Sequence, residues 1–309
     1  GAVIGSSSSI GESSDPITAL IPTTDDRLII GGKNSMHILT GDPSSPATQL
    51  VSVSKEIGIV GQEAWCYGPN KSVFFMGENG LYSLQPNEFD VAQNNRVSLG
   101  KLDKTFTDID FSTYRCNLMY DHSLYGVHIF LNPQTRNNNA LTHYFYDTRS
   151  DSFWQMEMPS IVGPTSVLDY QHLDPTARKI LMGGYDGHVR TFNNDSKDDD
   201  GTKIDSHVWI GPLQISADRE SKLTQLIAVL DEQTDGLGYE IYAADTVEAA
   251  KASEPIVSGE WSSGRNASAR MRVRGSAIFV RLKSDAVALP WSIESLTATL
   301  AVAGKVRQR

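Results

Sequence analysis

Residues 28–39 read LIIGGKNSMHIL: an apolar strand, a glycine-containing turn and a second strand. The same pattern returns as VFFMGENGLYSL at 73–84 and ILMGGYDGHVRTF at 180–192, with a looser relative at 125–156. Because glycine and asparagine tolerate the positive φ angles of tight turns, each copy predicts a β-hairpin. Hairpins repeated at about the length of a propeller blade predict an all-β, propeller-like array. Such arrays present surfaces and channels, so we look for function first in binding and assembly.

The chain divides into three expected regions. Residues 1–15 are rich in glycine and serine, which predicts a flexible lead-in. Residues 16–203 carry the hairpins and predict the propeller-like domain. Its four hairpin units are fewer than many rings contain, which leaves two readings open: upstream blades complete the ring, or the ring is imperfect. The polar loop NNDSKDDDGTK closes this region. Residues 204–309 then predict a β-sandwich, jelly-roll-like, with one short helix at 245–252 capped by Asp245.

The strand expected at 270–283 has the sharpest local pattern. Arginines occupy even positions between apolar residues at 271 and 273, but beyond Gly275-Ser276 the apolar residues take the even positions. A period of two that slips by one residue predicts a β-bulge at this dipeptide. Four arginines in and before this strand are our candidates for an interaction site: Arg265, Arg270, Arg272 and Arg274. Three readings stay open for them: a solvated sheet face, a surface that docks on an acidic neighbour, and a DNA contact.

The charge of the chain is unevenly distributed. The formal net charge is −10, yet residues 261–309 hold nine Lys or Arg against two acids, a net of +7, which leaves −17 for the rest. An acidic body argues against tight binding of nucleic acid. Unlike charges on two parts of one chain favour electrostatic pairing between neighbouring molecules.

No motif predicts a catalytic residue, a cofactor or a metal ion, and we expect none of the three. The seven histidines form no helical pair with a nearby Glu, and the two cysteines are expected to be buried free thiols. The tract 196–201 resembles the start of a calcium loop, but His207 stands where the closing Glu belongs. Carboxylate pairs at 108 and 110, on one expected strand face, and at 147 and 151, flanking a turn, are common in an acidic chain. No apolar run has the ~20 residues of a membrane span.

Several stretches together resemble structural proteins of tailed bacteriophages. They are DPITALIPTTDDRLIIGGKNSMHILTGDP at 15–43, IGIVGQEAWCYGPNKSVFFMGENGLYSL at 57–84, the Tyr146-Asp147-x-Arg149 and Ser152-Phe153-Trp154 pattern, and GRNASARMRVRGSAIFVRL at 264–282. The proteins in question are the propeller-bearing components of the neck and tail, such as nozzle and hub proteins. The resemblance covers most of the chain and contains no catalytic motif.

This resemblance implies a non-enzymatic virion protein of the tail or neck, assembled in the host cytoplasm. It implies a homo-oligomeric ring, often a hexamer, that surrounds the DNA path without binding DNA tightly and contacts adaptor, portal or tail-fibre proteins. Docking through the four arginines is our own inference. The alternative reading, from a different class, is a propeller that binds or cleaves glycans in host recognition, with exposed tryptophans as stacking platforms.

Overall fold

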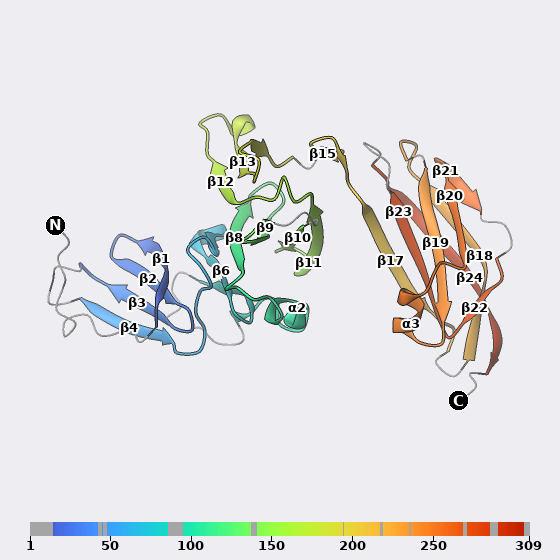
Figure 1. Ribbon diagram of the computed structural model, residues 1–309, viewed down its shortest axis with the longest axis horizontal. Helices are drawn as coiled ribbons and strands as arrows, with labels where there is room; N and C mark the ends of the chain where they lie inside the picture. The colour runs from blue at the N-terminus through green and yellow to red at the C-terminus, as the bar shows by residue number, and fades with distance from the viewer. Residues whose placement is uncertain are drawn as a thin grey trace. The chain divides into compact units, whose positions relative to one another are not determined.

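The computed structural model describes residues 15–42, 45, 48–85, 95–136, 141–193, 195–216, 219–234, 236–267, 271–284 and 290–305. The chain divides into two compact units, Gly1–Asn193 and Asn194–Arg309, within the polar loop from which the sequence predicted a boundary. Both units consist of small antiparallel sheets with little helix (Figure 1). The expected all-β class is therefore confirmed. Of the lead-in expected at 1–15, all but Asp15 lies outside the described residues.

The described residues of the first unit form four antiparallel sheets in which strands follow one another in chain order: β1-β2-β3-β4, β5-β6-β7, β8-β9-β10-β11 and β12-β13-β14. We name them the first, second, third and fourth sheets. Their strands are β1 (Ile17–Thr24), β2 (Arg27–Gly32), β3 (Met36–Thr40), β4 (Gln49–Ser54), β5 (Trp65–Tyr67), β6 (Val73–Gly77), β7 (Gly80–Leu84), β8 (Tyr114–Asp121), β9 (Gly126–Pro133), β10 (Leu141–Asp147), β11 (Ser152–Met158), β12 (Ser166–Tyr170), β13 (Lys179–Gly183) and β14 (Val189–Thr191). All the hairpins expected from the repeated pattern are present.

Buried side chains connect each of these sheets to the next. One apolar cluster takes residues from the first three sheets, among them Ile38, Phe75 and Ile129. A second cluster joins the third sheet to the fourth, with Phe130 packed near Ile180. Apolar contacts therefore link the first three sheets to one another and the third sheet to the fourth.

Short helices interrupt the strands. Those in the described part of the first unit are α2 (Asp103–Thr107), which the sequence did not predict, and the 3-10 turns η1 (Pro69–Lys71) and η3 (Pro175–Ala177). The helix α3 (Val247–Ala252) of the second unit begins one residue later than expected: Thr246, not Asp245, accepts the capping hydrogen bond from the Ala249 N–H at 3.2 Å. Asp and Thr are both good N-cap residues, so sequence alone does not choose between neighbours.

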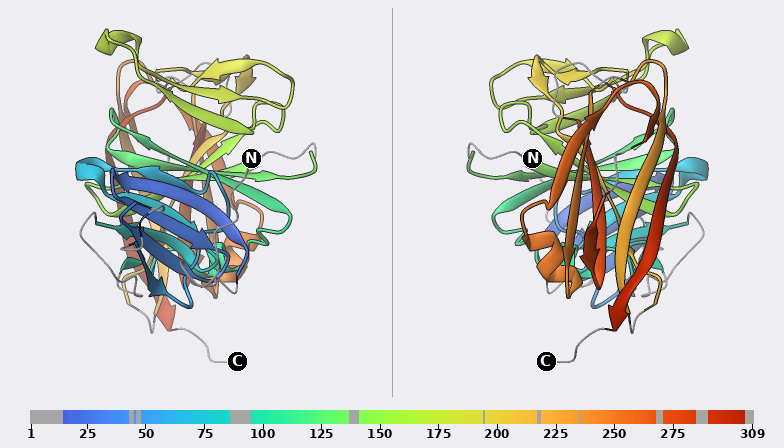
Figure 2. Two further views of the ribbon diagram at one scale, coloured as in Figure 1. Left: turned by 90° about the vertical axis from the view of Figure 1, so that its left-hand side faces the viewer. Right: turned by 90° about the vertical axis from the view of Figure 1, so that its right-hand side faces the viewer.

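The described residues of the second unit form two main sheets, β17-β23-β19-β20 and β21-β18-β22, with β24 paired to the other edge of β18. Figure 2 shows the long strands β18 and β24 side by side. The strands are β15 (Asp198–Asp199), β16 (Thr202–Lys203), β17 (Ser206–Leu213), β18 (Arg219–Leu230), β19 (Leu237–Ala244), β20 (Val257–Trp261), β21 (Gly264–Ala267), β22 (Val273–Gly275), β23 (Ala277–Ser284) and β24 (Ile293–Lys305). Both sheets contribute to one core, which contains Leu226, Ile241 and Val280.

The phase slip at Gly275-Ser276 has a different cause from the one expected. Gly275 still pairs with Ser221 of β18, whereas Ala277 pairs with Ala244 of β19 in the other sheet. The predicted β-bulge is therefore wrong: the chain leaves one sheet at Gly275 and enters the other two residues later. Where the chain passes from one sheet to the other, the alternation of inward and outward side chains starts again relative to the second sheet. The sequence then shows the same slip of one residue.

Candidate interaction surface

The segment 271–274 has its arginine side chains exposed to solvent, as the alternation predicted. Met271 and Val273 are buried in the core of the second unit, while Arg272 and Arg274 between and beyond them are exposed. The period of two along a strand fixes this division, because successive side chains point to opposite faces. Arg270 lies outside the described residues.

Arg274 is not a free cation. Its Nε donates to Oε2 of Glu220, a half-buried carboxylate on the neighbouring strand β18. Directly opposite Arg274 in the ladder stands Lys222, also on β18. The sheet therefore gathers two cations and one anion here, and Glu220 offsets the repulsion between like charges on one ladder pair.

Arg265 stands apart from this group. It lies on β21 and pairs with Val229, seven positions along β18 from Lys222. At a rise of about 3.3 Å per residue, the two ends are roughly 23 Å apart. The structure thus divides the predicted site: the exposed Arg265 lies near one end of β18, and Arg272 and Arg274 lie near the other. Sequence reasoning missed Glu220 and Lys222, although both alternate with the buried Leu223 at the start of β18.

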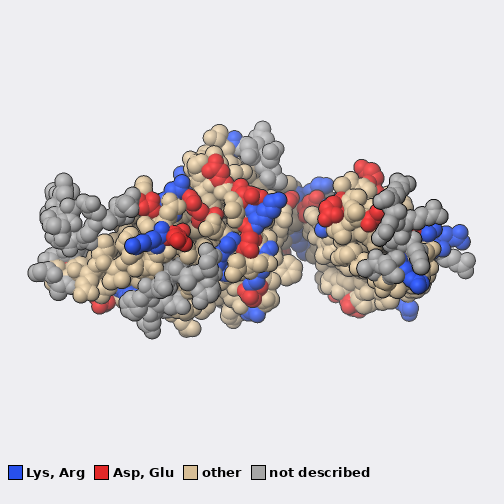
Figure 3. Space-filling model, turned by 90° about the horizontal axis from the view of Figure 1, so that it is seen from below, with Lys and Arg blue, Asp and Glu red and all other residues tan. Residues whose placement is uncertain are grey.

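The acidic body is not a patch of one sign. On the face drawn in Figure 3, acidic and basic side chains are interspersed over the first unit. Many of them are paired at short range, as with Lys33 and Glu78 at 3.3 Å or Asp186 and Arg190 at 2.6 Å. The two parts of the chain therefore differ in net charge, while many individual charges of the first unit lie in short-range ion pairs.

A second charged cluster lies on the sheet β17-β23-β19-β20. Glu240 accepts from Lys283 at 2.8 Å and from the Tyr242 hydroxyl at 2.7 Å. Burial raises the pKa of Glu240, but these hydrogen bonds outweigh it and the net pKa is lowered. The Arg281 guanidinium lies 5.6 Å from the ring centre of Trp209. Beside Glu240 is a shallow hollow of about 390 Å³, lined by Gly236, Gly238, Tyr239, Glu240, Ser258, Gly259, Glu260 and Lys283.

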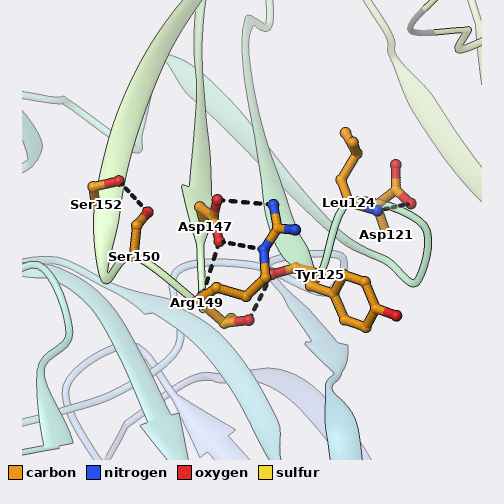
Figure 4. A network of polar contacts seen from close by, with 8 residues as sticks. Asp121, Leu124, Tyr125, Asp147, Arg149, Ser150 and Ser152 are labelled. Carbon is orange, nitrogen blue, oxygen red and sulfur yellow. Dashed lines mark hydrogen bonds and ion pairs between the residues drawn. The ribbon is translucent and has the colours of Figure 1, made fainter.

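The Tyr146-Asp147-x-Arg149 pattern builds a turn (Figure 4). Asp147 accepts from the backbone N–H of Arg149 at 2.8 Å and from its guanidinium at 3.2 and 3.1 Å. These bonds lower the pKa of Asp147 to about 2. The guanidinium also lies 5.3 Å from the ring centre of Tyr125, and the Thr148 N–H donates to the Tyr125 carbonyl at 3.0 Å. The motif therefore locks the β10–β11 turn onto the β8–β9 turn.

The carboxylates considered for acid–base chemistry serve local structure. Asp108 ends the helix α2, and Asp110 accepts from the backbone N–H and hydroxyl of Ser112 at 2.9 and 2.6 Å. The expectation that these two share a strand face is wrong. Asp151, the last residue of the β10–β11 turn, accepts from the Tyr146 hydroxyl at 2.8 Å and pairs with Lys101.

The calcium-like tract 196–201 contains β15 and the turn of the small β15–β16 hairpin. There Asp198 accepts the N–H of Gly201 at 3.0 Å, so one of its carboxylate oxygens closes the turn. Throughout the described part of the chain, no three His, Cys, Asp or Glu side chains gather as metal ligands do. Nor does any described helix have the length and apolar character to cross a membrane.

Two buried histidines lie between the third and fourth sheets. His128 pairs with Asp121 at 3.3 Å, and Nδ1 of His143 accepts the N–H of Leu131 at 3.0 Å. Burial, and then the neighbouring His128, lower the pKa of His143 to about 3. His143 is therefore neutral at physiological pH and serves as a hydrogen-bond acceptor inside the sheet stack.

Comparison with known proteins gives no family. No family model matches the chain, and no curated protein does. Among solved structures, the extracellular domain of a one component system from B. thetaiotaomicron aligns with a TM-score of 0.29 and 8% identity. The alignment covers 86% of this chain and 53% of that one. A similarity of this strength carries no argument about fold or function.

Proposed function

We propose that this chain is a non-enzymatic structural protein of a phage tail or neck, which assembles with its own copies into a ring around the DNA path. In this proposal the stacked sheets of the first unit act as propeller blades and the two sheets of the second unit as a sandwich. The observation that carries it is the exposed pair Arg272 and Arg274, with Lys222 opposite Arg274, on an otherwise acidic chain. Glu220 offsets one of these three cations, and the remaining positive charge supplies a docking surface for an acidic neighbour. The resemblance to nozzle and hub proteins agrees with it.

Charge also suits a conduit for DNA. A ring that guides DNA must not bind it tightly. Tight binding arises when cationic side chains displace the counterions of the phosphates. A chain of net charge −10 instead repels the phosphates. Ring contacts join two different surface patches, so unlike charges on two parts of one chain fit such an assembly. Neighbours in this proposal are adaptor, portal or tail-fibre proteins of the virion, and sixfold symmetry is the expected order.

Light scattering on the purified full chain tests the proposal, with a charge-reversed variant alongside. In R265E/R272E/R274E we expect native circular dichroism, because all three side chains are exposed, and a loss of the oligomer. The matched control is K55E/K71E/K104E, which makes the same change in net charge at exposed positions of the first unit. Equal assembly by both variants would remove the arginines from the interface, and a monomeric wild-type chain at high concentration would refute the ring.

One observation favours the glycan-binding alternative. Trp154, in the edge strand β11, has 61% of its surface exposed, in contrast to Trp261, which is buried. An exposed indole ring is the kind of surface on which sugars stack. Binding of host polysaccharide that is lost in W154A and kept in the control L99A, also exposed, would favour this function.

A further inference from the structure

The long strand β24 lies at one edge of its sheet and is paired along one side only. Its register runs from Ile293 opposite Leu230 to Lys305 opposite Arg219, all on β18. No other described strand pairs with β24, which lies beside β18 in Figure 2. We propose that an extended acidic segment of a partner protein adds to this free edge as a further strand. This inference rests on the docking surface of the proposed function and specifies what that surface recognises.

The middle of β24 has nothing that protects an edge from pairing. Residues 295–302 read SLTATLAV, without a charged residue or a proline. The register of β24 is regular over this stretch, and the one shift here places an extra residue on β18 instead. Successive backbone N–H and C=O groups of a strand point to alternate sides, so half of them point away from β18. Such a row is a template for another strand.

The other edges of the two main sheets differ from β24. The edge strand β17 contains Pro212 and a register shift beside it. The edge strand β20 is five residues long and carries the exposed Glu260. On the far side of β18, β21 and β22 have only four and three residues. Proline, irregular register, charge and short length are the usual means by which proteins keep an edge from pairing. Among these described edges, β24 alone lacks all of them over its middle.

The charge beside this edge gives the chemistry of the partner. Lys222 of β18 pairs with Ala301 of β24 on one side and with Arg274 of β22 on the other. Because paired residues share a face, the three side chains form one row across the sheet. A strand added to β24 extends this row, with its backbone two spacings of about 4.8 Å from that of β18. A glutamate there reaches over the small side chain of Ala301 toward Lys222.

Alternation along β24 sets the rest of the partner's pattern. The side chains of Leu296, Ala298 and Leu300 pack against the core of the second unit. Those of Thr297 and Thr299, between them, are exposed on the face that carries Arg272 and Arg274. An added strand follows the same period of two. The segment that fits therefore alternates apolar residues, which extend the core side, with acidic residues on the cationic side.

A short peptide of alternating Val and Glu is the probe, and hydrogen exchange of the full chain is the readout. Without peptide, the amides of 295–302 that point away from β18 should exchange rapidly. With peptide they should become protected, while the amides of β17 and β20 should not change. A peptide of alternating Val and Lys is the charge control, and we expect it to bind at least about tenfold more weakly.

Two N-methylated forms of the Val/Glu peptide separate strand addition from charge attraction alone. One carries methyl groups on its odd-numbered amides and the other on its even-numbered amides. An added strand pairs through one set and leaves the other in solvent, so one form should lose binding and the other should keep it.

Protein variants test the cations. R272Q/R274Q should weaken binding of the Val/Glu peptide about threefold to thirtyfold, as expected for two exposed ion pairs. The matched control R265Q/K251Q also removes two exposed cations from the second unit, away from this row. It should leave the affinity within about twofold of the original, since salt screens distant charges.

Several outcomes would overturn the inference. Equal binding of both N-methylated forms would exclude strand addition, and equal affinities of the two protein variants would exclude an acidic partner. Protection of 295–302 that rises with protein concentration in the absence of peptide would assign the edge to a second copy. Slow exchange of all its amides at every concentration would mean that the chain covers the edge itself. Light scattering reports on the ring separately: a monomer that binds the peptide would support this inference and refute the ring, and a ring that does not bind it would do the reverse.

Discussion

Gly58 offers the sharpest test of how the first two sheets are joined. It lies between β4 and β5, where the chain runs against the β2–β3 turn. A Cβ atom at this position would stand 2.3 Å from the carbonyl oxygens of both Gly32 and Lys33, and these are backbone atoms that a rotamer change cannot move. The next residue, Ile59, is fully buried and donates its N–H to Gly32 at 2.8 Å. Gly58→Ala must therefore push the segment away from the turn.

The cost of this displacement is the sum of three effects. Separating the segment from the turn breaks one buried hydrogen bond, about 1 kcal/mol, and overpacks the site, about 1–3 kcal/mol. The loss of unfolded-state entropy on going from Gly to Ala returns about 0.4–1 kcal/mol. We expect a net loss of about 1–3.5 kcal/mol in the free energy of unfolding.

The matched control lies three residues away. At Gly61 a Cβ would meet only the Cβ of Ala64, at 4.0 Å, so Gly61→Ala should change stability by less than about 1 kcal/mol in either direction. Urea denaturation followed by tryptophan fluorescence measures both variants, because Trp65 and Trp154 report on this unit. Equal midpoints for the two variants would refute the packing described between these sheets.

Three further predictions concern single groups. His143 has a pKa near 3 in the folded state and 6.5 in the unfolded state, so between these pH values the unfolded state binds more protons than the folded state. The contribution of His143 to the free energy of unfolding should therefore be fully present above pH 6.5 and fall as the pH drops toward 3, by up to about 1.4 kcal/mol per pH unit. His143→Gln should flatten that slope in acid titrations of the unfolding free energy, and an unchanged slope would count against the assignment. Cys66 and Cys116 should resist Ellman's reagent in the folded chain and both react in denaturant; rapid labelling of the native protein would contradict their burial. Arg274→Ala should lower the free energy of unfolding by less than about 1 kcal/mol, since the Arg274 side chain is 56% exposed. A thermal-shift measurement that gives a clearly larger loss would mean that the Arg274–Glu220 pair stabilises the fold more than an exposed ion pair does.

Local patterns in the sequence predicted much of this fold. Gly77 and Gly80 pair across the β6–β7 turn where the sequence reads GENG, as hairpin chemistry requires. The alternation of arginines with Met271 and Val273 correctly predicted which side chains are buried. Such features depend on neighbours within a few residues, and these neighbours are visible in the sequence.

Features that depend on distant residues were missed. The bulge expected at Gly275-Ser276 was instead a change of sheet, because pairing partners on β18 and β19 decide it. Glu220, which pairs with Arg274, comes 54 residues earlier in the chain. The separation of Arg265 from Arg274 likewise follows from which strands flank β18. Helix α2 was missed because Leu102 precedes it without a capping side chain.

The central claim is that copies of this chain surround an axis. Electron microscopy of the purified full chain, with particles classified by symmetry and without symmetry imposed, tests it most directly. We predict closed rings with an open centre and with neighbouring copies in contact through unlike surfaces. Images that contain only single copies, or pairs related by a twofold axis, at concentrations well above those of assembly in a cell, would contradict the account.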